Sequence, residues 1–362
     1  MKRNEYFCNI IMKTNFDRFL KQWSKSAIAI VAAILLTSCA SQSKWYQASG
    51  ATWGTSFHIR YHAARALDDT IVATMGVIDD LFSFRNPESE ISRINNAPDP
   101  VVPSAEFTRL FEVSRRISTM SGGAFDPTVG PLVDIWGFGK GKVNRDSEGR
   151  LEAPEQAVID SLLNIVGISD CSIDSLGRLI KKSPATRFDF SAIAKGYGVD
   201  CVAQALERNG AEDYMVEIGG EVRVRGLNPE GEEWTISVDS PEAGNDIVPG
   251  SLSATRIQLK QGAIATSSNS RNRQRLSDGK IAGHTISPAT GRPASTDMLS
   301  ATIVANDCMT ADAMATACMV LPSADAMRMV EKEKIAAFFV IITESDTKIW
   351  KSSEWEKMFN KV

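Results

Sequence analysis

Histidine is scarce in this sequence, and the usual glycine patterns for binding phosphate are missing from it. The 362 residues contain three histidines and six cysteines, and no two cysteines have C-x-x-C spacing. Neither a G-x-G-x-x-G strand-to-helix fingerprint nor a G-x-x-x-x-G-K-[ST] loop occurs. These absences argue against a cysteine-based metal site and against Rossmann or P-loop nucleotide binding.

Positive charge is also in short supply once the first 38 residues are set aside. The formal net charge is -4, but those 38 residues hold six Lys or Arg against two acids, which leaves 34 basic and 42 acidic residues afterwards. Surfaces that bind polyanions carry an excess of positive charge, so we do not expect nucleic acid as a partner. With 43% hydrophobic residues the chain can bury a large core.

The N-terminus indicates an export signal. Lys21 and Lys25 precede the apolar run SAIAIVAAILL, and the residues LTSC end it at Cys39. This pattern predicts a signal peptide over 1–38; a transmembrane anchor is the alternative, although the run is short for a span. LTSC resembles the lipobox of bacterial lipoproteins. That resemblance implies lipidation of Cys39 and a cell-membrane location facing the periplasm or exterior.

The pattern of strands and helices indicates an α+β or mixed α/β fold. A lipidated tether over 39–48 precedes a domain over 49–352, and irregular alternation argues against a doubly wound parallel sheet. The four remaining cysteines are expected to be buried free thiols, with a disulfide left open. We expect helices at 65–82, 105–120, 155–163, 192–208, from Thr310 and at 323–333, and strands at 53–61, 178–182, 186–190, 214–226, 233–240, 256–260, 263–267, 299–305, 336–342 and 348–352, with a surface loop at 137–150.

Two glycine-containing segments in the first half suit a ligand. In 121–139, paired glycines either end a helix or let the backbone approach a ligand beside Phe125 and Trp136. In 187–200, a helix that begins near Ala192 gathers free amide groups and Lys195, which is a favourable place for phosphate.

Two further segments follow. Gly219 and Gly220 interrupt a strand pattern, as a hairpin or bulge or as room for a bulky ligand. His284 lies in a polar, turn-rich run and is either an ordinary hydrogen-bonded residue or a base that takes a proton from an alcohol.

The segment TADAMATACMVL places two oxygen groups on one face of an apolar helix. Thr310 is positioned to cap this helix, and Asp312 and Thr316 lie four residues apart. In one interpretation Asp312 pairs with the helix dipole and Thr316 bonds back to its carbonyl. In the other the two residues form a magnesium site, because that ion prefers oxygen and takes few protein ligands.

Eight motifs in order resemble the ApbE family, the FAD:protein FMN transferases. They cover about residues 49 to 350 and read WGTSF, FSFRNPESEISRIN, SGGAFDPTVGPLVDIWGFG, DFSAIAKGYGVD, VEIGGEVRVRG, ATSSNSRNR, HTISPATGRP and ADAMATACMVL. The resemblance implies a single T-fold-like domain of two lobes with FAD in the cleft between them. It also implies an Mg²⁺-dependent enzyme that transfers FMN from FAD to a threonine or serine hydroxyl of a partner and releases AMP.

The same resemblance implies roles for individual residues. Asp312 and Thr316 match the family's magnesium ligands, with Ala192 adding its backbone carbonyl. His284 matches a histidine that assists proton transfer, so His284 and Asp312 are the expected catalytic residues. The expected flavin-nucleotide contacts are Trp53, where methionine is more usual, Arg85, where an aromatic residue is more usual, Ala124, Phe125, Asp126, Asp189, Lys195 and His284.

Three activities remain compatible with such a site. Transfer of FMN to a protein is favoured, FAD pyrophosphatase activity giving FMN and AMP is the first alternative, and flavin binding without turnover is the second. The resemblance implies an acceptor that is a flavoprotein subunit of a membrane redox complex, of the sodium-translocating quinone reductase or Rnf type.

Overall fold

The computed structural model describes residues 43–239, 253–269, 273–343 and 346–359. The predicted signal peptide and Cys39 therefore lie outside the described residues, as does the first part of the predicted tether. Among the described residues, no helix has both the length and the apolar character that crossing a bilayer requires. The following description concerns the unit Trp45–Val362.

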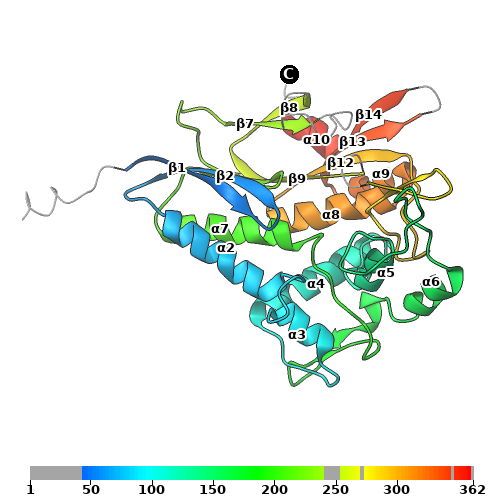
Figure 1. Cartoon of the computed structure of the whole chain (residues 1–362). Coiled ribbons are helices and arrows are strands. Elements are labelled where there is room, and N and C mark those ends of the chain that lie inside the picture. The colour runs from blue at the N-terminus through cyan, green and yellow to red at the C-terminus, as the bar shows by residue number, and fades with distance from the viewer. Residues whose placement is uncertain (1–42, 240–252, 270–272, 344–345, 360–362) are drawn as a thin grey trace, which may run out of the picture. The chain divides into compact units, whose positions relative to one another are not determined.

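One large sheet organises this unit (Figure 1). Its strand order is β1-β2-β5-β6-β9-β12-β13-β14, and every pairing with a resolved register, from β2 to β14, is antiparallel. The mixed α/β prediction is confirmed, since a doubly wound sheet would be parallel. The strands are β1 Lys44–Thr52, β2 Thr55–Ala63, β5 Tyr214–Ile218, β6 Glu221–Arg225, β9 Gln261–Ser268, β12 Met298–Ala305, β13 Ala336–Ile342 and β14 Thr347–Lys351.

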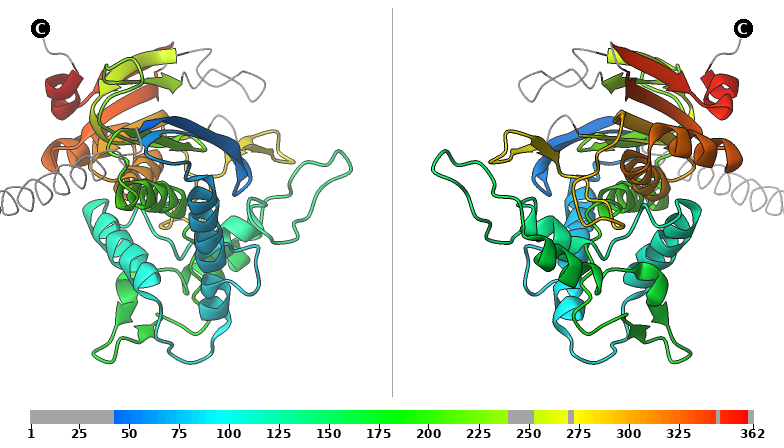
Figure 2. Two further views of the ribbon diagram at one scale, coloured as in Figure 1. Left: turned by 90° about the vertical axis from the view of Figure 1, so that its left-hand side faces the viewer. Right: turned by 90° about the vertical axis from the view of Figure 1, so that its right-hand side faces the viewer.

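Helices cover one face of the sheet (Figures 1 and 2). Helix α7, Ala194–Arg208, packs on β5 and β6, and α8, Cys308–Val320, packs on β9 and β12. The other face is covered by the hairpin of β7, Trp234–Asp239, with β8, Ser253–Leu259, and by α10, Ser353–Phe359.

The remaining elements lie around this core. Helices α2 and α4 pack on α7 and α8 respectively. The bounds are α2 Asp68–Phe82, α3 Glu90–Asn96, α4 Ala105–Met120, α5 Gly130–Ile135, α6 Gln156–Leu163, α9 Ser323–Lys332, the 3-10 turn η1 Ile168–Asp170, and the short strands β3 Ser172–Ile173, β4 Leu179–Ile180, β10 Arg273–Arg275 and β11 Ile281–Gly283.

The sheet residues alternate between two cores, as a period of two requires. In β13, Phe339 packs with the residues of α8, whereas Phe338 packs with the β7–β8 hairpin and Trp355. Both faces of β13 are therefore buried against apolar side chains.

Two strand predictions differ from the structure. The segment Lys44–Thr52 was expected to begin as a tether, but it forms the edge strand β1. Residues 186–190 form no strand, although Phe188 and Phe190 are buried. The backbone amides there bond to the Asn95 side chain at 2.7 Å and to the Pro127 carbonyl at 2.6 Å, so the alternation reflects burial without strand pairing.

The prediction of free thiols is confirmed, and the prediction of burial holds for three of the four cysteines. Cys171, Cys201, Cys308 and Cys318 are all free thiols, and all but Cys201 are buried. Burial raises the pKa of the Cys308 thiol well above its ordinary value, which keeps this group protonated and unreactive.

Candidate active site

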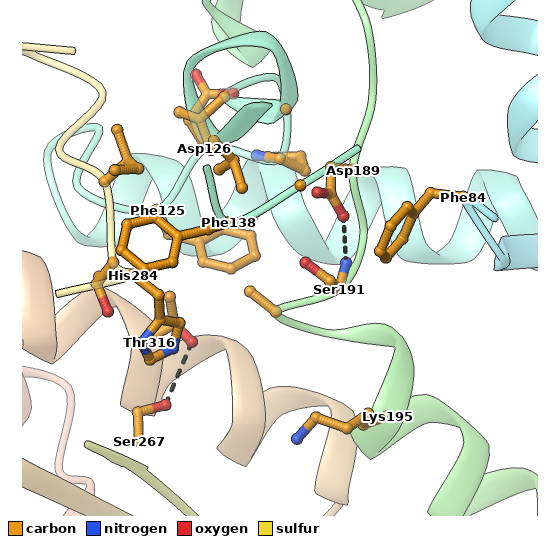
Figure 3. Close-up of a pocket in the computed structure, with 18 of the residues that line it drawn as sticks. Phe84, Phe125, Asp126, Phe138, Asp189, Ser191, Lys195, Ser267, His284 and Thr316 are labelled. Carbon is orange, nitrogen blue, oxygen red and sulfur yellow. Dashed lines mark hydrogen bonds between the residues drawn. The ribbon is translucent and has the colours of Figure 1, made fainter. Parts of the chain in front are cut away.

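A cavity of about 1230 Å³ is lined by almost all the residues that the sequence predicts to be catalytic or ligand-binding (Figure 3). Its lining comes from the sheet and α8 on one side and from segments 84–140 and 185–195 on the other. The predicted residues that line it are Arg85, Ala124, Phe125, Asp126, Asp189, Ala192, Lys195, His284, Asp312 and Thr316. The expected cleft between two parts of one domain is therefore present.

Asp312 and Thr316 face this cavity from helix α8. Helix α8 begins at Cys308 and is capped by the Asp307 side chain, so the prediction that Thr310 caps it is wrong. Asp312 thus lies beyond the first turn, where interaction with the helix dipole fades. The Thr316 hydroxyl forms a hydrogen bond of 3.3 Å with the hydroxyl of Ser267 on β9 (Figure 3). The predicted bond to the Asp312 carbonyl is not among the hydrogen bonds of the described residues.

The start of helix α7 leaves one carbonyl oxygen without its usual donor. In a regular helix the Gly196 amide would donate to the carbonyl four residues earlier, at Ala192. Instead it donates to the Asp312 carboxylate at 3.0 Å. Among the described residues no hydrogen bond reaches the Ala192 carbonyl, and Ala192 lines the cavity. This local departure from helix geometry leaves the Ala192 carbonyl without a helical donor, in a residue that lines the same cavity as Asp312.

Lys195 contacts a carboxylate that the sequence analysis missed. Its ammonium forms an ion pair with Oε1 of Glu221, the first residue of β6, which is 3% exposed and lines the cavity. Burial raises the pKa of Glu221 to about 7, although Lys195 opposes this shift. Burial also raises the pKa of Asp312 against the pull of Lys195. The available signal was an acid directly after the Gly219–Gly220 pair, at the start of a strand.

These groups fit a hard divalent cation. Asp312, Thr316 and Ala192 offer a carboxylate, a hydroxyl and a carbonyl, all of them oxygen donors. Nowhere in the described ranges do three His, Cys, Asp or Glu side chains gather as a complete metal cage. Mg²⁺ keeps several waters or phosphate oxygens and needs only one or two carboxylates from protein, so this sparse donor set suits it.

His284 lies on the aromatic side of the cavity. Its ring makes an edge-on contact with Phe138, with centroids 6.3 Å apart, and both residues line the cavity together with Phe125 (Figure 3). The imidazole therefore lies in the cavity wall beside aromatic rings.

The two predicted aspartate contacts have structural partners as well. Asp126 accepts hydrogen bonds from the amide and hydroxyl of Thr128 and from the amide of Ile168. Burial raises the pKa of Asp126, although these bonds act against the rise. Asp189 accepts from the Ser191 amide at 2.8 Å (Figure 3). Asp126 thus connects its own segment of the cavity wall to the residues at Ile168.

Phe84 supplies an aromatic face beside Arg85. Both residues line the cavity, and the Arg85 guanidinium lies 5.6 Å from the centre of the Phe84 ring. The Lys140 ammonium lies 5.4 Å from the same ring. Phe84 therefore offers the flat surface that Arg85 cannot, with two cations around it.

Trp53 does not join the other predicted flavin contacts. It is absent from the lining of the cavity, and its ring packs against helix α7 at Gly198, where a Cβ would lie 2.2 Å from the indole. Its ring occupies the space that this glycine leaves, so the structure gives Trp53 a packing role.

Comparisons with known proteins find relatives over nearly the whole chain. The sequence profile of the ApbE family matches residues 53–339. The chain is 34% identical to a FAD:protein FMN transferase of Vibrio cholerae, over 92% of this chain and 98% of the relative. It is 32% identical to one of Haemophilus influenzae, over 94% and 99%.

Solved structures show the same fold. The flavin transferase ApbE from Vibrio cholerae superposes with a TM-score of 0.77 at 33% identity, covering 88% of this chain and 100% of the other. The apo flavinyl transferase ApbE of Pseudomonas stutzeri gives 0.77 at 28% identity, covering 89% and 98%. Sequence, fold and cavity together place this chain in the ApbE family.

Proposed function

We propose that this protein transfers the FMN part of FAD to a threonine or serine hydroxyl of a partner protein, with Mg²⁺ as cofactor and AMP as the leaving product. The observation that carries the proposal is the Asp312–Thr316 pair facing a cavity whose other wall is aromatic. A diphosphate and an isoalloxazine ring need these two surfaces side by side. Relatives that share about a third of the sequence over nearly their whole length are named FAD:protein FMN transferases.

Asp312, Thr316 and the Ala192 carbonyl would hold the cation. When bound, Mg²⁺ neutralises phosphate charge and so supports attack by an alcohol on a diphosphate. Placing Asp312 and Thr316 one turn apart on a packed helix fixes their separation better than a loop would. Lys195, at the start of α7, adds a positive charge beside the same phosphates.

The transfer step breaks one bond and forms one. The acceptor oxygen bonds to the FMN phosphorus, and the bond from that phosphorus to the bridging oxygen breaks, so AMP leaves with that oxygen. We expect His284, which lines the cavity, to take the hydroxyl proton of the acceptor. Phe84, Phe125 and Phe138 hold the flavin ring by apolar contact and exclude water from it.

The family resemblance supports a proposal for the acceptor, and the N-terminal pattern supports one for the location. We propose that Cys39 is lipidated, that the protein is anchored to the cell membrane on its outer side, and that its acceptor is a flavoprotein subunit of a sodium-translocating quinone reductase or Rnf-type complex. Replacing Cys39 with serine should release the protein into the soluble fraction. Retention of the Cys39→Ser variant in the membrane would contradict the lipid anchor.

The experiment that tests the activity mixes the soluble domain with FAD, Mg²⁺ and a purified acceptor subunit of this kind. Mass spectrometry is expected to show one FMN joined to an acceptor threonine or serine, with an equal amount of AMP. Release of free FMN with no modified acceptor would identify a FAD pyrophosphatase instead. Intact FAD after long incubation would identify a flavin-binding protein.

A further inference from the structure

Glu221 is held at the cavity by a tight hairpin. Strands β5 and β6 pair with Ile218 opposite Glu221, so only Gly219 and Gly220 form the turn. Both glycines have positive φ, +67° and +101°, which L side chains rarely adopt. Because the register of a hairpin decides which face each side chain occupies, this turn commits Glu221 to the interior.

The Glu221 carboxylate is only half satisfied there. Oε1 pairs with Lys195, whereas Oε2 is buried and has no hydrogen-bond partner in the described part of the chain. A buried charged oxygen without a partner is costly, so such a group indicates a missing ligand. The residue lines the same cavity as Asp312.

The local charges favour a cation at this point. Two buried carboxylates, Asp312 and Glu221, interact with each other and with one ammonium, that of Lys195. The cluster therefore carries one negative charge more than positive when both acids are ionised. The Lys195 ammonium neutralises part of this negative charge, so a divalent ion would compete with Lys195 for the two carboxylates.

We propose that Glu221 is the second carboxylate of the divalent-cation site, with Oε2 helping to hold the hydrated ion beside Asp312 and Thr316. This inference rests on the proposed function, because it concerns the cation of that reaction. It assigns to the Gly-Gly-Glu turn a role in cation binding and to Lys195 the opposing role of a competing charge. The alternative is that Glu221 only positions the Lys195 ammonium.

The two roles differ in a direct binding measurement. Calorimetric titration with Mn²⁺, without FAD, is expected to show about tenfold weaker binding in Glu221→Gln, the size typical of groups that support metal ligands. Lys195→Met is expected to bind Mn²⁺ more tightly than the parent protein, because the competing ammonium is gone. Glu221→Asp should lie between the parent and Glu221→Gln, because a shorter carboxylate remains.

Matched variants separate the possible failures. Glu207→Gln removes a carboxylate that pairs with Arg223 and Arg225 outside the cavity lining, and it should leave Mn²⁺ affinity unchanged. Asp312→Asn should weaken binding. If Asp312→Asn weakens binding while Glu221→Gln and Lys195→Met match the parent, Glu221 has no part in the cation site and the proposed function stands. If Asp312→Asn also matches the parent, the proposed cation site fails together with this inference.

Discussion

The amide of Gly196 donates a hydrogen bond to the carboxylate of Asp312 at 3.0 Å, and this contact joins the start of helix α7 to helix α8. The two helices approach so closely there that a Cβ on Gly196 would lie 2.3 Å from the Cys308 carbonyl oxygen. The same contact diverts the amide that would otherwise bond to Ala192. The close packing of α7 on α8 therefore also determines which oxygen atoms are available at the site.

Adding one methyl group at this contact should disturb it. Gly196→Ala is expected to lower the free energy of unfolding by about 1–3 kcal/mol, because the obstacle is backbone that cannot turn aside. Thermal unfolding measures the loss. The control is Gly76→Ala, since Gly76 is at an exposed position of helix α2 with nothing near its Cβ, and this change should stabilise by about 0.5–1 kcal/mol. Equal effects at the two glycines would contradict the close packing of α7 on α8.

Loss of the imidazole should slow transfer without emptying the site. His284→Gln is expected to reduce the rate of FMN transfer by about 10²–10⁴-fold, the usual contribution of a general base, with FAD affinity unchanged. Single-turnover kinetics together with FAD titration separate the two quantities. His58→Gln is the control, since His58 is exposed and bonds to Glu217 away from the cavity lining. A full transfer rate in His284→Gln would remove this residue from the mechanism.

Trp53 should matter for stability and not for ligand affinity. Trp53→Ala is expected to cost about 3 kcal/mol of unfolding free energy, because the indole fills the space over Gly198. The dissociation constant of the Trp53→Ala variant for FAD should match that of the parent protein at a temperature where both are folded. A tenfold weaker affinity with unchanged stability would return Trp53 to the flavin contacts.

One carboxylate should contribute to stability near neutral pH and lose that contribution in acid. Asp297 accepts hydrogen bonds from the amide and hydroxyl of Ser323, at the start of α9. Partial burial acts to raise its pKa, but these two bonds prevail and hold the pKa below the ordinary value. A lowered folded-state pKa stabilises the protein above the unfolded-state pKa, about 3.9, and this stabilisation is lost as pH falls through the folded-state value.

The measurement is a comparison of unfolding midpoints across pH. Asp297→Asn is expected to be less stable than the parent near neutral pH, and the difference should shrink below about pH 4. A difference that stays constant from pH 7 to pH 2 would show that the Asp297 charge does not contribute.

Periodic, well-capped segments could be predicted from the sequence. The apolar spacing over 105–120 matches helix α4 residue for residue, and the continuous apolar run at 336–342 matches β13, which is buried between two cores. In both cases the local pattern and the tertiary burial agree.

Other features depend on contacts between distant segments. Strand β1 is an exposed edge of polar sequence, and nothing in Lys44–Thr52 itself marks its pairing. The partner of Lys195 is 26 residues away, on a strand whose register is set by the Gly219–Gly220 turn. The ordered motifs identified which residues serve the site, but the Lys195–Glu221 pair emerged only once α7 and β6 were placed together.

The measurement that tests the central claim most directly is FAD cleavage by the Asp312→Ala variant, with Mg²⁺ and an acceptor subunit present. The account predicts that AMP release and flavin transfer are both abolished while the protein stays folded, since removing a buried charge relieves a desolvation cost that offsets the lost bond from Gly196. Turnover near that of the parent protein would contradict the assignment of Asp312 as the carboxylate that holds the cation.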